Sequence, residues 1–169
     1  TKNRPQVEGI SGAIENVGGF INATTDKEIT MLLCSVTPPH FGLCMEVLFD
    51  MVKNPLFNGD ELDKERLVIL EELALSKDRP DYRVDLLMDQ ILWPDHPLGR
   101  DVGGARESVM KLDRDTIMRL KESQYNPENM VLSVAGNVSH EEVIKLAEKN
   151  LADWTFHATL PSFPLKEKD

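Results

Sequence analysis

The stretch at residues 61–77, ELDKERLVILEELALSK, constrains the fold of this chain most, because it predicts one long helix with both ends marked. Asn58 and Asp60, just before it, are typical of a helix start, and Pro80, just after it, is typical of a helix end. Glu65 and Glu72 are seven positions apart, so they share one face of this helix.

Two interpretations of these carboxylates follow from the residues. Acids beside apolar positions are costly to remove from water unless a cation or a hydrogen-bond donor compensates them. One interpretation is therefore a metal site with Glu72 as the ligand and Glu65 as an accessory acid. The other interpretation is a solvated acidic face, since acids are common in the first turns of helices. Periodicity alone favours the solvated face.

Composition excludes several classes of protein. The chain has 169 residues, 41% apolar and 28% charged, which is a soluble, single-domain composition. A formal net charge of −10 argues against a nucleic acid or an anionic membrane as partner. No apolar run is long enough to predict a membrane span. Cys34 and Cys44 lie in apolar runs and are predicted to be free thiols, which fits a reducing, cytoplasmic location of bacterial type.

Hydrophobic spacing predicts an α+β fold: a small, mostly antiparallel sheet with helices packed on one face. The predicted domain is 1–153, followed by a linker or tail at 154–169. Three strands are few for this much helix, so we expect the sheet to lack members that an upstream segment supplies. We predict helices at 5–17, 40–54, 61–77, 82–92, 113–124 and 139–151, and strands at 20–25, 29–36 and 129–135.

Four motifs in register resemble the pitrilysin/insulinase family of zinc metallopeptidases, which includes the mitochondrial processing peptidases. They are GGFINATTDKEIT, NPLFNGDELDKERLVILEEL, HPLGRDVGG and YNPENMVLSVAGNVSHEEV. Each motif alone is weak evidence for the family. All four occur in the order and spacing of the family, and the resemblance covers residues 5–153. The resemblance implies a processing-peptidase-like fold, truncated at its N-terminus.

The resemblance also implies a metal site. In this family an H-x-x-E-H helix supplies two imidazole ligands and a general base, and a distant glutamate completes the zinc ligands. That glutamate is the last acid of an E-R-x-V-x-x-x-E run, which assigns the metal ligand to Glu72 and a catalytic-site accessory acid to Glu65. Glu71 is one position away and points about 100° elsewhere on a helix.

The chain departs from the family pattern because it contains no H-x-x-E-H. By the usual spacing of the family, the paired histidines fall just before Thr1. We therefore expect zinc in the intact protein, none bound to this chain alone, and no peptidase activity of the chain by itself. The four histidines present are scattered: His40, His96, His140 and His157.

The resemblance further implies that an extended peptide substrate pairs with a strand edge formed by Asn22, Ala23 and Thr24. The alternative is that Asn22 and Thr25 only shape the hairpin turn. A second homologous half, in the same or a separate chain, is the expected partner. An exposed sheet edge predicts association between copies of this fragment.

The leading hypothesis is thus a fragment of a zinc-dependent metalloendopeptidase that hydrolyses extended peptides. One alternative is a non-catalytic scaffold or partner half of the same family. Another is a helix-rich binding module, which requires all four motif matches to be coincidental.

Overall fold

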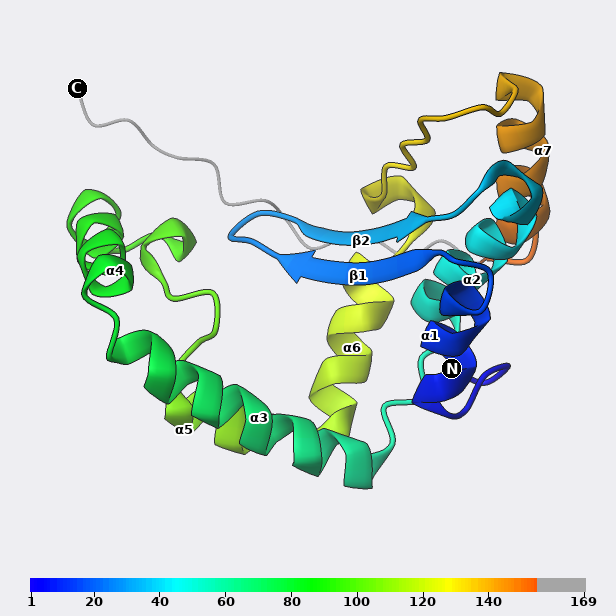
Figure 1. Cartoon of the computed structure of the whole chain (residues 1–169). Coiled ribbons are helices and arrows are strands. Elements are labelled where there is room, and N and C mark those ends of the chain that lie inside the picture. The colour runs from blue at the N-terminus through cyan, green and yellow to red at the C-terminus, as the bar shows by residue number, and fades with distance from the viewer. Residues whose placement is uncertain (155–169) are drawn as a thin grey trace. The chain divides into compact units, whose positions relative to one another are not determined.

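The computed structural model describes residues 1–154 and is rich in helix (Figure 1). Among these residues, no helix combines the length and apolar character needed to cross a membrane. The α-helices and strands, in chain order, are α1 (Val7–Glu15), β1 (Phe20–Thr25), β2 (Thr30–Ser35), α2 (Phe41–Lys53), α3 (Gly59–Lys77), α4 (Pro80–Leu92), α5 (Arg106–Lys111), α6 (Arg114–Gln124) and α7 (His140–Leu151). Three short 3-10 turns are η1 (Pro38–His40), η2 (Pro97–Gly99) and η3 (Pro127–Asn129).

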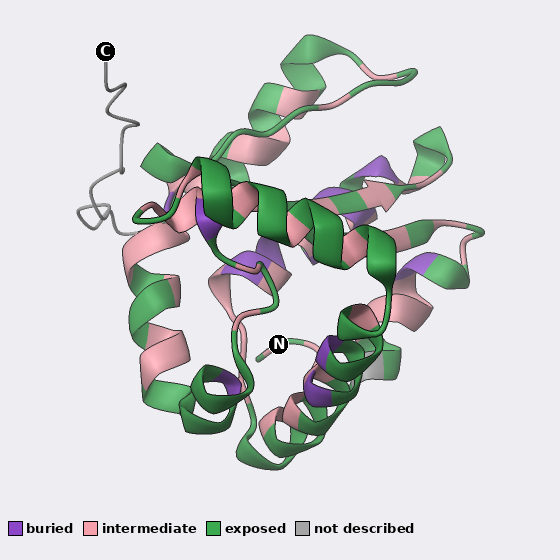
Figure 2. Cartoon of the chain, turned by 90° about the vertical axis from the view of Figure 1, so that its left-hand side faces the viewer, coloured by how far each residue is buried: buried purple, intermediate pink, exposed green. Residues whose placement is uncertain are grey.

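The described chain divides into two compact units. The first comprises residues 1–24, 31–56 and 119–154, and the second comprises residues 25–30 and 57–118. Figure 2 shows that buried residues form small patches and that most of the helical surface is exposed.

The core of the first unit forms between α2 and α7. Phe41, Met45 and Phe49 recur every four residues, so they lie on one face of α2, and all three are buried. Met45 is 1% exposed. Partly buried residues from the segment before α7, from α7 and from its C-terminal end cover this face: Val134, Val138, Val143, Leu146, Ala147, Leu151 and Trp154.

The N-terminal segment is tied to α2 through one buried carboxylate. Asp50 is 5% exposed and accepts hydrogen bonds from the Thr1 hydroxyl at 2.5 Å and from Asn3 Nδ2 at 2.6 Å. Asn54 Nδ2 donates to it at 2.9 Å, and the Arg4 guanidinium lies 3.4 Å away. Four donors from two segments therefore compensate the charge of Asp50.

Cys34 and Cys44 are free thiols, as predicted from the sequence. Cys44 is buried on α2, and its Sγ lies 3.9 Å from the carbonyl oxygen of Cys34 on β2. Burial, with the hydrogen bond and charge of Cys34, raises the pKa of the Cys44 thiol to about 12. Cys44 is therefore a packing residue and a poor nucleophile.

The second unit is organised by α3. The Asn58 side chain accepts a hydrogen bond from the backbone N–H of Asp60 at 2.9 Å, which caps the start of the helix as predicted. Leu70 and Leu73 are buried against Val109 of α5. α4 begins with Pro80 in its first turn and packs against η2.

The α+β class with a small antiparallel sheet is confirmed, because β1 and β2 form a two-stranded hairpin. The prediction of a third strand at residues 129–135 is wrong. These residues are assigned to no strand, and Val131 is 94% exposed. The alternating apolar pattern is that of a strand, but a strand forms only where a partner supplies backbone hydrogen bonds, and no partner is found in residues 1–154.

We expect Asp50→Asn to lower the free energy of unfolding by about 2–4 kcal/mol, because an amide has one oxygen in place of two and turns an N–H donor toward the donors of Thr1, Asn3 and Asn54. Glu46→Gln is the matched control, since Glu46 also pairs with Arg4 but its side chain is 61% exposed. The control is expected to cost at most about 1 kcal/mol. Urea denaturation followed by circular dichroism measures both, and equal losses contradict the assignment of Asp50.

The Asp50 carboxylate also makes the free energy of unfolding depend on pH. Burial raises the pKa of Asp50, but hydrogen bonds from Thr1, Asn54 and Asn3, with the charge of Arg4, outweigh burial and hold the pKa below its ordinary value. A lowered pKa in the folded state contributes stability above the unfolded pKa, and this contribution is lost as the pH falls below about 4. Asp50→Asn is expected to reduce this acid-induced loss of stability.

Candidate functional site

The two predicted acids lie on one exposed face of α3. Glu65 and Glu72 are two turns apart, or about 10 Å along the helix axis. Both are exposed, away from the face that buries Leu70 and Leu73. Within residues 1–154 neither carboxylate has a hydrogen bond or an ion pair with another side chain. Their roles stay predictions.

Apolar side chains interrupt this acidic face. Val68 and Leu75 follow Glu65 and Glu72 at positions three residues on, so all four form a stripe with spacings of three and four. Val68 is 47% exposed and Leu75 is 68% exposed. We call these four residues the α3 stripe. Exposed apolar side chains next to carboxylates make the stripe compatible with a contact surface, although exposed apolar residues also occur on other elements of the structure.

Arg66 holds α3 against α5. Its Nη2 donates to the Leu112 carbonyl oxygen at 2.7 Å, and its Nε donates to the Val109 carbonyl oxygen at 3.3 Å. Its Nη1 is paired with Asp63. The arginine of the E-R-x-V-x-x-x-E run therefore fixes α3, including the stripe, relative to the C-terminal end of α5. The sequence analysis missed this role because the acceptors are backbone carbonyls more than forty residues away.

In the first unit, Asn22, Ala23 and Thr24 lie on β1 and are exposed. In a two-stranded sheet, each strand has one edge whose backbone groups are unpaired. The Asn22 side-chain oxygen accepts a hydrogen bond from the backbone N–H of Ala23 at 2.9 Å. The outer edge of β1 has the features expected of a peptide-binding strand, and that role remains a prediction.

The hairpin turn is shaped by other residues than Asn22 and Thr25. The backbone N–H of Asp26 donates to the Ile29 carbonyl oxygen at 2.8 Å, and the Asp26 carboxylate accepts from the N–H of Lys27 at 2.7 Å. The Lys27 ammonium pairs with Asp89 on α4 and donates to the carbonyl oxygen of Leu98. The turn is therefore tied to α4 and η2. A lysine between two acids carries no sequence signal for such contacts.

The HPLGRDVGG loop has a structural role. His96 Nδ1 accepts a hydrogen bond from the N–H of Leu98 at 3.2 Å. A Cβ at Gly99 would overlap the backbone carbonyl oxygen of Trp93, so glycine is required there for close approach. A Cβ at Gly103 would lie 2.7 Å from Leu73 Cδ2, so the Leu73 side chain would have to shift.

Asp101 organises the same loop. It accepts hydrogen bonds from the Tyr82 hydroxyl at 2.6 Å and from the N–H of Gly103 at 2.9 Å. The hydrogen bond to Asp101, with burial and the charge of Asp101, raises the pKa of Tyr82 to about 12.

No group of three or more histidine, cysteine, aspartate or glutamate side chains within residues 1–154 is placed to hold a metal ion. His157 lies outside the described residues. Catalytic zinc takes three protein ligands. The chemistry of the α3 stripe fits one oxygen ligand, from Glu72, and the remaining ligands have no counterpart in the described part of the chain.

Residues 1–106 match the family described as Insulinase (Peptidase family M16), and residues 111–169 match the Peptidase M16 inactive domain. An uncharacterized zinc protease of Rickettsia bellii is 34% identical over 155 residues, which make up 92% of this chain and 37% of that protein. An uncharacterized zinc protease of Mycobacterium leprae is 37% identical over 141 residues, or 83% of this chain and 32% of that protein.

Two solved structures share the fold. An M16-like peptidase from Alicyclobacillus acidocaldarius matches with a TM-score of 0.79 at 22% identity, over 92% of this chain and 36% of that one. The first half of the periplasmic protease PqqL from Escherichia coli matches with a TM-score of 0.81 at 21% identity, over 99% of this chain and 38% of that one. This chain spans about a third of the length of the curated relatives it matches.

The Tyr82–Asp101 hydrogen bond predicts a spectroscopic result. The chain has two tyrosines, so subtracting the alkaline absorbance titration of Tyr82→Phe from that of the unmodified chain isolates Tyr82. The difference is expected to have its midpoint near pH 12. A midpoint near the ordinary tyrosine value of about 10 contradicts the hydrogen bond in solution.

Proposed function

The chain belongs to the insulinase family of peptidases (peptidase family M16), and we propose that it forms part of a zinc-dependent metalloendopeptidase that hydrolyses extended peptides. The observation that carries this proposal is the α3 stripe. Its two carboxylates lack any partner in the described chain, and the apolar residues beside them favour a covered surface over a solvated one.

In the whole protein, Glu72 would hold the zinc ion as its carboxylate ligand, and Glu65, two turns away on the same face of α3, would help to orient the ligand set. An H-x-x-E-H segment outside residues 1–169 supplies the two imidazoles and the general base. Bound zinc supplies a water of lowered pKa and polarises the substrate carbonyl. Glu71 takes no part, because it points about 100° away from Glu72.

The substrate is an extended peptide that adds to the outer edge of β1. Backbone N–H and C=O groups of Asn22, Ala23 and Thr24 bind the peptide main chain, so recognition there is independent of the peptide side chains. Two observations support this proposal. Asn22, Ala23 and Thr24 are exposed, and the hairpin turn is shaped by Asp26 and Ile29 rather than by Asn22 and Thr25. A second homologous half, in the same or another chain, is the proposed partner.

A second candidate function is a non-catalytic scaffold half of the same family. The match of residues 111–169 to a domain described as inactive favours it. Zinc content separates the two proposals, because a scaffold half has no need of a carboxylate ligand at position 72.

The test uses the whole protein, measured for zinc content and for cleavage of an unstructured peptide with and without a chelator. Glu72→Gln is expected to abolish stoichiometric zinc and chelator-sensitive cleavage, because an amide is a weaker ligand than a carboxylate. Glu65→Gln is expected to retain zinc more weakly, by about 10–100-fold. Residues 1–169 alone are expected to bind no stoichiometric zinc and to be inactive.

Glu71→Gln is the matched control, because it removes the same charge from the same helix one position away. It is expected to behave as the unmodified protein. Equal effects of the two substitutions contradict the assignment of Glu72, and a zinc-free, inactive whole protein supports the scaffold function.

The exposed hairpin predicts association of the isolated chain. Met31 is 49% exposed and Leu33 is 47% exposed on β2, at a sheet with free edges. We expect light scattering to show dimers or larger species, and Leu33→Lys to reduce them because a charge blocks strand pairing. Ile91→Lys on α4 is the control, at a residue that is 74% exposed. A monomer at high concentration contradicts the prediction.

A further inference from the structure

Leu73, the residue after Glu72 on α3, is held by two other segments of the second unit. It is 6% exposed and packs against Val109 of α5. The backbone of Gly103 also lies close to it, because a Cβ built at Gly103 would come within 2.7 Å of Leu73 Cδ2. Arg66, the other anchor of α3, lies about 9 Å before Glu72 along the helix axis. The contacts of Leu73 are therefore nearer to Glu72 than those of Arg66.

Asp101 builds the turn that brings Gly103 to Leu73. Its backbone carbonyl oxygen accepts a hydrogen bond from the N–H of Gly104 at 3.0 Å, and its side-chain Oδ1 accepts one from the N–H of Gly103 at 2.9 Å. Gly104 has a φ of 79°, in the left-handed region that glycine adopts without strain. We call residues 101–104 the Asp101 turn. Its conformation, and with it the position of Gly103, depends on an oxygen acceptor at position 101.

The same side-chain oxygen ties the Asp101 turn to α4. The Tyr82 hydroxyl donates a hydrogen bond to Asp101 Oδ1 at 2.6 Å. Both side chains are partly buried, so water competes for this hydrogen bond less than it does at an exposed site. One carboxylate oxygen therefore holds the turn between α4, through Tyr82, and α3, through Gly103.

The position of Leu73 bears directly on that of Glu72. A metal ligand has to be held to within about 0.5 Å, which requires support from the residues around it. Glu72 and Leu73 point about 100° apart on the helix, so Leu73 can be buried while Glu72 stays exposed. The two residues share a peptide bond within one helical turn. A displacement of the Leu73 backbone therefore moves Glu72 as well.

We propose that the Asp101 turn positions Glu72 for metal binding, with Asp101 as the positioning residue and Gly103 as the contact of the turn with α3. Asp101 acts through the hydrogen bonds that its Oδ1 accepts rather than through its charge. This inference rests on the proposed function, in which Glu72 is the carboxylate ligand of zinc. It gives the HPLGRDVGG motif a part in the same site as the NPLFNGDELDKERLVILEEL motif, because the two motifs meet at Gly103 and Leu73.

The experiment measures the zinc dissociation constant of the whole protein by competition with a chromophoric chelator, and the free energy of unfolding of the zinc-free protein by urea denaturation. Asp101→Ala removes the acceptor and is expected to weaken zinc binding about tenfold. Asp101→Asn keeps an oxygen that accepts both hydrogen bonds, so its zinc binding is expected to stay within about twofold of that of the unmodified protein. Asp95→Ala, which removes an exposed carboxylate between α4 and α5, is the matched control and is expected to leave zinc binding unchanged.

A second set of variants tests the contact between Gly103 and Leu73. The backbone of Gly103 lies outside the left-handed region, so Gly103→Ala changes mainly the space around Leu73. Because Leu73 is confined by Val109, we expect its displacement to pass in part to α3 and to weaken zinc binding about threefold. Leu73→Val removes the Cδ atoms that the new methyl group would touch, so the double variant is expected to bind zinc as Leu73→Val does. Circular dichroism checks that each variant is folded, and the Gly103 variants decide the test if Asp101→Ala does not fold.

The inference is overturned if Asp101→Asn weakens zinc binding as much as Asp101→Ala, or if Gly103→Ala has the same effect with and without Leu73→Val. A lower free energy of unfolding with an unchanged zinc dissociation constant also overturns it, because that result identifies a purely structural role for the Asp101 turn. In each of these cases Glu72→Gln still loses zinc, and the proposed function stands. Retention of stoichiometric zinc by Glu72→Gln is a different result, which overturns the proposed function and this inference with it.

Discussion

Compensation of charge decides which carboxylates within residues 1–154 can be withdrawn from water. Asp50 is withdrawn from water beneath hydroxyl, amide and guanidinium donors, and Asp101 is held by a phenol and a backbone N–H. Asp89 is paired with an ammonium group. Glu65 and Glu72 have no such partner and are exposed. Because an uncompensated carboxylate cannot be buried cheaply, these two acids can be covered only together with a cation or with hydrogen-bond donors.

The long helix α3 therefore has two faces with different requirements. One face is satisfied within its own unit by Leu70 and Leu73 against α5. The other face carries Glu65 and Glu72, which are exposed in the described part of the chain. The rotation of the helix about its axis decides which residues occupy each face. Arg66 fixes that rotation through two backbone carbonyls, so the motif arginine positions the motif glutamate without contacting it.

Features that depend on a few neighbouring residues could be predicted from the sequence. The Asn58 cap is local chemistry and was expected. The absence of a strand at residues 129–135 could not be predicted, because an apolar alternation does not specify whether a pairing partner exists. Three of the four donors of Asp50, from Thr1, Asn3 and Arg4, were also beyond reach, since they lie more than forty residues away in the sequence. For the site, the motif register was enough to nominate Glu72 as the metal ligand. That the Glu72 side chain is exposed could be seen only in the structure.

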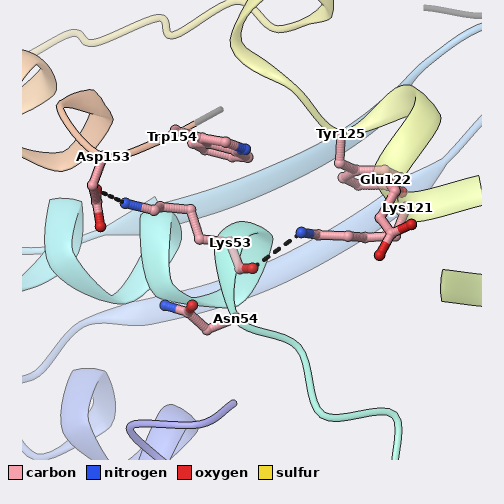
Figure 3. A pocket seen from close by; sticks show the side chains of 7 residues that line it. All are labelled: Lys53, Asn54, Lys121, Glu122, Tyr125, Asp153 and Trp154. Atoms are coloured by element: carbon pink, nitrogen blue, oxygen red, sulfur yellow. Dashed lines mark hydrogen bonds and ion pairs between the residues drawn. The ribbon is translucent and has the colours of Figure 1, made fainter. Parts of the chain in front are cut away.

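The same rule of compensation applies to the amines. Lys53 and Lys121 line one pocket (Figure 3), yet only Lys53 is matched by a carboxylate. A charged group that is already paired gains little from a second partner, whereas an unpaired charged group can still bind one. In the α3 stripe, Glu65 and Glu72 have no such partner within residues 1–154, which suits an incoming cation. The stripe and the pocket lie in different units and share no residues.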